Sequence, residues 1–148
     1  MRPIMIFLMM LALAACGGGP AVTTGKAEGA GKAATADQLL GTEWLLEDLG
    51  GSGVLEGIQA TLAFPQAGRI AGQGSCNRYT GPVTLGADGA FKAGQFAMTR
   101  MACPPAVMDQ ETQYIQALAN GERVAFDGPS LILFTKGMEK PLRFIRKK

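Results

Sequence analysis

The stretch GQGSCNRYTG, residues 72–81, decides the fold of this chain. Its glycines permit a positive φ or a close approach between two segments of backbone. Asn77 can adopt the left-handed conformation or bond its own backbone, as asparagines in turns do. We therefore expect Cys76 and Asn77 to form a tight turn, held in place by a bridge from Cys76 to Cys103.

A second cysteine-bearing stretch, MTRMACP, covers residues 98–104. The chain has three cysteines, and the assignment of Cys16 to a lipid, argued below, leaves Cys76 and Cys103 as an even pair. In an oxidising compartment the simplest account of such a pair is a disulfide. Closing a loop of this length stabilises a fold by roughly 3–4 kcal/mol. Two free thiols that bind metal or carry out redox chemistry are the alternative, although neither cysteine has a C-x-x-C spacing.

Short strand patterns separated by turn residues extend on both sides of these stretches. Expected strands cover residues 43–47, 60–64, 69–72, 83–85, 91–101, 123–126, 131–135 and 141–145. Pro65 ends the second of these strands, Ala67-Gly68 joins it to the third as a hairpin, and Asp88-Gly89 is a further hairpin signal.

One helix is expected over residues 107–119, where apolar side chains recur at helical spacing. Pro104 and Pro105 precede this segment, and Asn120-Gly121 follows it in the manner of a C-terminal cap. Many short strands and one helix predict the α+β class. We expect a single small domain of mostly antiparallel β-sheet, curled around one α-helix, behind a signal peptide and a flexible tether.

The two cysteine-bearing stretches together resemble the META/HslJ-like family, whose members carry G-x-x-G-C-N-x-[YF]-x-G followed by T-[RK]-M-A-C. Trp44 near the domain start and Glu111 on the following helix also fit the pattern, while Ser75 stands where the family usually has glycine. The resemblance covers about residues 39–148. It implies a small domain of mostly antiparallel sheet, often carried by secreted lipoproteins, and it implies no reaction.

The chain begins MRPIMIFLMMLALAAC, with Arg2 as the only charge before Cys16. This apolar run is well short of the roughly 20 residues that span a membrane, and it is typical of a signal peptide. The ending LAAC resembles a bacterial lipobox. We predict that residues 1–15 are a lipoprotein signal peptide and that Cys16 is the acylated N-terminus. An ordinary signal peptide that contains a cysteine, or a short buried helix, is the alternative.

Residues 16–37 follow as a lipid-anchored flexible linker, because they are rich in glycine, alanine and threonine and too poor in apolar side chains to fold. The domain is expected over residues 38–148. Gly17, directly after Cys16, favours sorting to the outer membrane. We therefore expect the protein in the envelope of a Gram-negative bacterium, anchored by lipid in the outer membrane and facing the periplasm.

Composition excludes several classes of function. The chain has no histidine, which removes Ser-His-Asp and Cys-His catalysis and every histidine-ligated metal site. Its 14 Lys+Arg nearly balance its 12 Asp+Glu, so it lacks the charge of a nucleic-acid-binding protein. The basic C-terminal residues are interpreted as a solvated terminus, with contact to anionic lipid or polymer as the alternative: Arg143, Arg146, Lys147 and Lys148.

Three carboxylates near the domain start, Glu43, Glu47 and Asp48, lack a positioned partner for acid–base chemistry and are interpreted as a solvated face. Ser52 lies in a Gly-Ser-Gly turn without the G-x-S-x-G motif of hydrolases. Three methionines are interpreted as core filling rather than a soft-metal site. These are Met98, Met101 and Met108.

The polar residues beside the expected bridge are the candidate contact surface: Asn77, Arg78, Tyr79, Thr99 and Arg100. We predict no catalytic residue, no metal and no cofactor. The expected function is that of a non-enzymatic, lipid-anchored envelope protein in stress tolerance or envelope maintenance, acting through an unnamed envelope protein or ligand. A small-ligand or peptide-binding module that uses the open end of the sheet is the main alternative. A hydrolase or redox enzyme is a second.

Overall fold

The computed structural model describes residues 31–148. The predicted signal peptide over residues 1–15, the lipidated Cys16 and most of the predicted linker lie outside these described residues, and they stay predictions.

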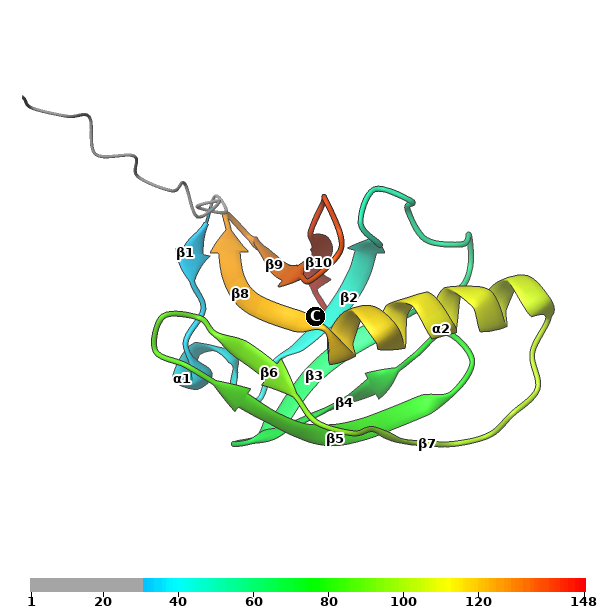
Figure 1. Cartoon of the computed structure of the whole chain (residues 1–148), viewed down its shortest axis with the longest axis horizontal. Helices are drawn as coiled ribbons and strands as arrows, with labels where there is room; N and C mark the ends of the chain where they lie inside the picture. Colours follow the sequence, from blue (N-terminus) through cyan, green and yellow to red (C-terminus); the bar gives the residue numbers. More distant parts are fainter. Residues whose placement is uncertain (1–30) are drawn as a thin grey trace, which may run out of the picture.

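Strands make up most of the domain (Figure 1). In chain order the elements are β1 (Lys32–Ala33), α1 (Ala36–Leu39), β2 (Glu43–Asp48), β3 (Thr61–Gln66), β4 (Arg69–Gln73), β5 (Arg78–Leu85), β6 (Phe91–Ala93), β7 (Ala97–Met98), α2 (Pro105–Ala119), β8 (Gly121–Asp127), β9 (Ser130–Thr135) and β10 (Leu142–Arg146). The predicted α+β class is therefore confirmed, with one long helix and a mostly antiparallel sheet.

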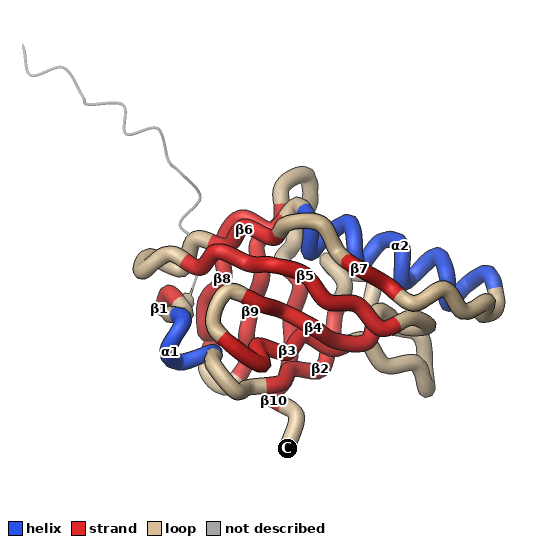
Figure 2. Tube along the Cα trace, turned by 90° about the horizontal axis from the view of Figure 1, so that it is seen from below, coloured by secondary structure: helices blue, strands red, loops and turns tan. Residues whose placement is uncertain are grey.

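The strands form one sheet in the order β1-β8-β9-β10-β2-β3-β4-β5-β6, and β7 pairs with β5. This sheet curls until its far ends meet, as the view from below also shows (Figure 2). At the meeting point Ala90 forms a bridge with Arg123, and the Val124 amide donates to the Gly89 carbonyl over 2.8 Å. The two ends of the sheet are thus held together by backbone hydrogen bonds.

Helix α2 crosses the open side of the curled sheet (Figure 1). It turns Tyr114 and Leu118, both fully buried, toward the sheet. Strand β2 contributes Trp44 and Leu46 to the same core by the alternation of a half-buried strand. The indole Nε1 of Trp44 donates to Thr42 Oγ1 over 2.7 Å, so its polar atom is satisfied inside the core.

The structure differs from the expected strands in three places. Strand β3 continues through Pro65 to Gln66, since a proline is tolerated where no ladder donor is needed. The expected strand over 91–101 is two short strands, β6 and β7, separated by an irregular segment. Strand β5 begins at Arg78 rather than at residue 83 and is the longest strand among the described residues.

The end of the expected linker is ordered, which corrects its boundary. Lys32 and Ala33 pair with β8, and Ala34 is fully buried. A short helix, α1, then begins at Ala36. An alanine-rich segment carries little apolar surface of its own, so only its tertiary contact with β8 orders it.

Helix α2 ends at Ala119 as expected, but it begins two residues earlier than expected. Pro105 is its first residue and Pro104 its N-cap, which suits a residue that has no amide hydrogen to leave unpaired. The C-cap is Asn120, whose Nδ2 donates to the Gln116 carbonyl over 2.9 Å. Gly121 is not a left-handed cap but the first residue of β8. A Cβ at that position would lie 2.6 Å from the Phe91 ring.

Candidate functional site

Cys76 and Cys103 form a disulfide with an S–S distance of 2.05 Å. The bond joins the residues just before β5 to the segment that leads into α2. Neither cysteine is therefore available as a free thiol for metal or redox chemistry in this structure.

Glu111 is the centre of the polar contacts beside this disulfide. Its side chain projects from α2 and is only 4% exposed. Oε2 accepts hydrogen bonds from the amides of Cys76, at 2.9 Å, and Asn77, and Oε1 accepts one from Asn77 Nδ2 at 2.8 Å. Successive backbone N–H groups that converge on one anion compensate for its lost hydration.

Gly74 makes this arrangement possible, because a Cβ at this position would lie 2.9 Å from Glu111 Oε2. Ser75 has a φ of 125° and is the one non-glycine residue with positive φ in the described part of the chain. The positive φ in this turn, for which Asn77 was one candidate, is therefore at Ser75. The Ser75 hydroxyl accepts a hydrogen bond from Gln110 Nε2 over 2.9 Å, which ties this loop a second time to α2.

Asn77 joins the two cysteine-bearing stretches. Its Oδ1 accepts hydrogen bonds from Thr99 Oγ1 at 2.9 Å and from the Met101 amide at 2.7 Å, while Nδ2 also donates to the Met101 carbonyl at 3.3 Å. The side chain is only 3% exposed. Asn77 is therefore a buried connector, which corrects its inclusion in the expected contact surface.

Tyr79 is also buried and does not belong to a contact surface. Its hydroxyl donates to the Thr61 carbonyl at 2.7 Å, and the hydroxyl of Tyr114 donates to the same carbonyl at 2.9 Å. The two hydroxyl oxygens are 3.2 Å apart. Burial raises the pKa of both phenols. This pair connects β5 and α2 to β3 and leaves no hydroxyl free for chemistry.

Three of the expected contact residues are exposed: Arg78, Thr99 and Arg100. Thr99 is fixed to β5, because its Oγ1 accepts from the Arg78 amide at 3.0 Å and its own amide donates to the Arg78 carbonyl at 3.0 Å. Neither Arg78 nor Arg100 belongs to the two ion pairs found within residues 31–148. Both guanidinium groups are therefore open to an external partner.

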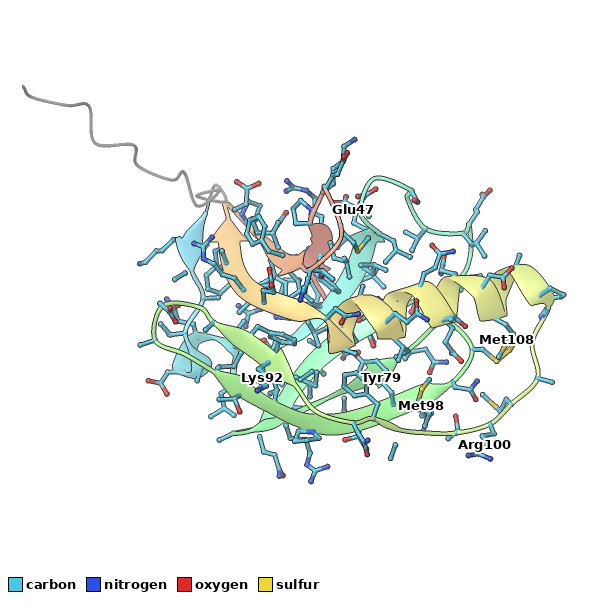
Figure 3. The ribbon with its side chains drawn as sticks, viewed as in Figure 1. Glu47, Tyr79, Lys92, Met98, Arg100 and Met108 are labelled. Atoms are coloured by element: carbon cyan, nitrogen blue, oxygen red, sulfur yellow. A yellow bond between two sulfur atoms is a disulfide. The ribbon has the colours of Figure 1, made fainter. Side chains whose placement is uncertain are left out.

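The expected core methionines line an open groove of about 640 Å³ beside the disulfide. Met98 and Met108 point into the space between β7 and α2, whereas Arg100 points away from α2 (Figure 3). Met101 is 54% exposed. Core filling is therefore wrong for Met101, whereas the partly buried Met98 does pack against the hydrophobic core, and Met108 is half-buried. Phe96 and the buried Glu111 also line this groove, which we call the methionine groove.

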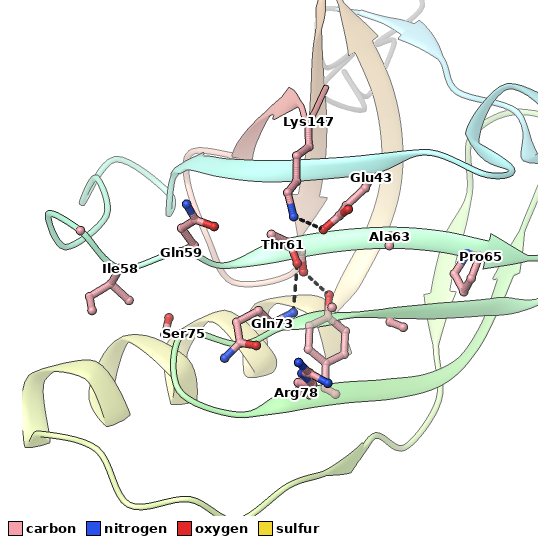
Figure 4. A pocket seen from close by; sticks show the side chains of 14 residues that line it. Glu43, Ile58, Gln59, Thr61, Ala63, Pro65, Gln73, Ser75, Arg78 and Lys147 are labelled. Atoms are coloured by element: carbon pink, nitrogen blue, oxygen red, sulfur yellow. Dashed lines mark hydrogen bonds and ion pairs between the residues drawn. The ribbon is translucent and has the colours of Figure 1, made fainter.

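A second groove, of about 700 Å³, lies on the outer face of β3 and β4 (Figure 4). Small residues form its floor, among them Ala63 and Gly72. On one rim Lys147 Nζ lies 2.7 Å from Glu43 Oε1, so these two charges neutralise each other. Arg78 lines the other side. We call it the polar groove.

The carboxylates near the domain start do not converge on one site. Glu43 pairs with Lys147, whereas Asp48 accepts hydrogen bonds from the amides of Gly51 and Gly53 and so holds the turn that contains Ser52. Glu47 is exposed. The part of the chain that the structure describes contains no group of three His, Cys, Asp or Glu residues able to hold a metal ion. Within the same residues, no helix has the length and apolarity needed to cross a membrane.

The sequence singled out most of these residues, but it could not separate buried connectors from exposed ones. Asn77 and Tyr79 flank Arg78 in the chain, yet alternation along β5 turns Arg78 outward and Tyr79 inward. Sequence reasoning missed the hydrogen bond from Gln110 to Ser75 and the grouping of the methionines in one groove. Only the placement of α2 against β7 brings Met108 near Met98.

Comparison with known proteins identifies the family to which this chain belongs. The model of the META domain matches residues 37–148. An NMR structure of a protein has a TM-score of 0.62 and 27% identity to this chain, and the match covers 76% of this chain and 94% of that one. Another NMR structure, of a protein from Burkholderia xenovorans, has a TM-score of 0.61 and 24% identity over 76% of this chain and 86% of that one. No curated protein matches the chain.

Proposed function

We propose, since this chain belongs to the META domain family, that it is a non-catalytic lipoprotein, held in the cell envelope through Cys16, which supports envelope maintenance or stress tolerance by binding a partner. The partner contacts the surface formed by Arg78, Thr99 and Arg100. The observation that supports this proposal is that the buried polar residues of the family motif form their hydrogen bonds inside the domain.

The buried polar groups that mark the family pattern already have partners inside the domain. Glu111 accepts three N–H groups, Asn77 is bonded at both side-chain atoms, and the hydroxyl of Tyr79 is bonded to the Thr61 carbonyl. A catalytic acid or base needs a lone pair or proton free to reach a substrate. These side chains instead fix the two cysteine-bearing stretches, which supports a scaffold that presents a surface.

Two of the three exposed side chains that form this surface are cations. Arg78 and Arg100 are both exposed, and Thr99 between them is held by two hydrogen bonds to the backbone of Arg78. Exposed arginines recognise carboxylates and phosphates with paired N–H groups. An anionic group on an envelope protein or polymer therefore suits this surface.

The polar groove supports a second candidate, a module that binds a small polar ligand or a peptide. Its volume of about 700 Å³ is in the range of ligand sites. Arg78 and the paired Glu43 and Lys147 would supply polar contacts. This ligand site lies on the outer face of the sheet and not, as we expected from the sequence, at its open end.

The lipid anchor is tested first by labelling cells with radioactive palmitate. The full chain is expected to carry label and to sediment with the membrane fraction. The Cys16→Ala variant is expected to lose both, since a thiol is needed to carry the diacylglycerol. An unlabelled full chain, or label that survives the Cys16→Ala change, would show that the anchor proposal is wrong.

The contact surface is tested by complementation of a strain that lacks the protein, with survival of detergent treatment as the measurement. The Arg78→Ala, Arg100→Ala double variant is expected to lose complementation while it keeps wild-type abundance and the disulfide. Lys92→Ala on β6 is the control, because Lys92 is an exposed cation outside both grooves. Full complementation by the double variant, or equal loss in the control, would contradict the proposed surface.

A further inference from the structure

We propose that Met98, Met101 and Met108 form a thioether site for a soft monovalent cation, Cu⁺ or Ag⁺, in the methionine groove. This inference requires neither the lipid anchor nor the proposed partner, although Thr99 and Arg100 of the contact surface also line the groove. It begins from the placement of methionine in the fold. The described residues contain four methionines, and three of them line this one groove.

Each of the three comes from a different and well-fixed segment. Met98 lies in β7, which pairs with β5 at Tyr79. Met101 follows in the loop, where Asn77 bonds both its amide and its carbonyl. Met108 lies in the first turn of α2, where its amide donates to the Pro104 carbonyl over 3.1 Å. The backbone positions are thus set, while the long, unbranched side chains can adjust to a ligand.

Packing does not account for the exposed position of Met101, whereas Met98 also packs against the hydrophobic core. Met101 is 54% exposed, although its backbone is bonded on both sides and the loop therefore needs no anchor from the side chain. Met98 and Met108 are half-buried and face the same open space of about 640 Å³ (Figure 3). One exposed and two half-buried methionines thus give the groove an apolar lining that solvent can reach, as sites of interaction have.

The chemistry of the donors selects the ion. Thioether sulfur is a soft donor that prefers Cu⁺ and its analogue Ag⁺ over hard or borderline divalent ions. Cysteine thiols do not compete, because Cys76 and Cys103 are bonded to each other, and the chain has no histidine. These absences leave thioethers as the only soft donors in the groove.

The lining of the groove holds one acidic and one basic side chain, Glu111 and Arg100. Glu111 lines it, and its oxygens are already occupied by N–H donors. Glu111 therefore acts through its negative charge and not as a direct ligand. The nearest cationic side chain in the lining, Arg100, points away from α2 and into solvent (Figure 3). A monovalent cation that enters from solvent would thus meet three thioethers, and the Glu111 carboxylate is part of the same lining.

The test is a titration of the full chain, purified in detergent and labelled with ¹³C at the methionine methyl groups, with silver nitrate in chloride-free buffer. Methyl signals of Met98, Met101 and Met108 are expected to shift together and to saturate at one equivalent of Ag⁺. The signal of Met138 is expected to stay in place, because Met138 packs beside Gly50 and lines neither groove. Cu⁺ supplied under anaerobic conditions should reproduce the shifts, and Zn²⁺ should not.

Single Met→Leu variants at the three positions provide the controls for specificity. Each is expected to weaken Ag⁺ binding by about tenfold or more because one soft ligand is lost, and Met138→Leu to leave it unchanged. Leucine nearly conserves the volume of methionine, so all four variants should keep wild-type thermal unfolding. The proposal is overturned if the three methyl signals do not saturate, if Met138→Leu weakens binding equally, or if Zn²⁺ produces the same shifts.

Discussion

Ser75 is the residue at which this chain departs from the family pattern, and its backbone conformation lowers the stability of the folded state. Its φ of 125° lies in a region that side chains with a Cβ rarely adopt. Such conformations cost about 1–3 kcal/mol. The hydrogen bond from Gln110 to the Ser75 hydroxyl offsets part of this cost, since a net hydrogen bond contributes about 0.5–1.5 kcal/mol.

Replacing Ser75 by glycine and by alanine separates these two effects, because both variants lose the hydroxyl. Alanine normally stabilises a fold relative to glycine by about 0.4–1 kcal/mol. At Ser75 we expect the reverse order, with Ser75→Gly more stable than Ser75→Ala by about 1–2 kcal/mol. Urea unfolding followed by the fluorescence of Trp44 measures the difference. Equal stabilities, or a more stable alanine variant, would show that residue 75 is unstrained.

The contact between α2 and the residues just before β5 depends on a hydrogen bond whose donor, Asn77, and acceptor, Glu111, can be exchanged by mutation. Asn77 Nδ2 donates to Glu111 Oε1, and Glu111 Oε2 accepts from two backbone amides. Asn77→Asp places a second carboxylate beside that of Glu111. Glu111→Gln places an NH₂ group, itself a donor, beside N–H groups that need an acceptor. Each single variant should therefore lose about 2–3 kcal/mol of unfolding free energy.

The double variant, Asn77→Asp with Glu111→Gln, restores a donor opposite an acceptor. We expect it to be more stable than the sum of the single losses predicts by about 1–2 kcal/mol, which is within the range of coupling between residues in contact. Guanidinium unfolding of all four proteins measures this cycle. Simple additivity would mean that the hydrogen bond between residues 77 and 111 contributes little.

Elements with a regular pattern were predictable from the sequence. The helical spacing over residues 107–119 predicted α2, and the turn at Ala67-Gly68 predicted the hairpin of β3 and β4. Residues 78–82 of β5 were not predictable as strand, because Gly81 and Pro82 are poor strand formers. Hydrogen bonding to β4 on one side and to β7 on the other holds this segment as a strand despite its low β propensity.

The candidate site was predictable only in part, and for a physical reason. The family pattern identified the residues around Cys76 and Cys103. Whether a given side chain is a connector or a surface depends on which face of β5 it occupies and on the position of α2. Both are set by long-range packing, so Tyr79 was placed on the surface when it lies in the core.

At the scale of the whole molecule, stability should fall in alkaline solution. The chain has two tyrosines, Tyr79 and Tyr114, and burial raises the pKa of both phenols. In the unfolded chain they ionise near pH 10. Above that pH the unfolded state binds fewer protons than the folded state, so the unfolding free energy decreases as pH rises. Below it, both states keep the phenolic protons and these residues add no pH dependence.

Each phenol can contribute a slope of up to about 1.4 kcal/mol per pH unit above pH 10. Denaturant unfolding at a series of alkaline pH values measures it, and Tyr79→Phe should reduce the slope by about half. Ultraviolet absorbance of tyrosinate is a direct check, since both tyrosines of the chain are in this pair. Ionisation of the folded protein near pH 10, without loss of structure, would contradict the prediction.

The closure between Ala90 and Arg123 also limits how this molecule can associate with copies of itself. An open sheet offers neighbouring chains a row of unpaired amides and carbonyls, which promotes fibril growth and strand exchange. Here the strands at the margins, β1, β6 and β7, have only two or three residues each. Backbone contacts from Gly89 and Ala90, just before β6, to Arg123 and Val124 of β8 close the sheet between these margins. A domain built mostly of strands is thereby protected from intermolecular strand pairing, even when many copies are crowded together.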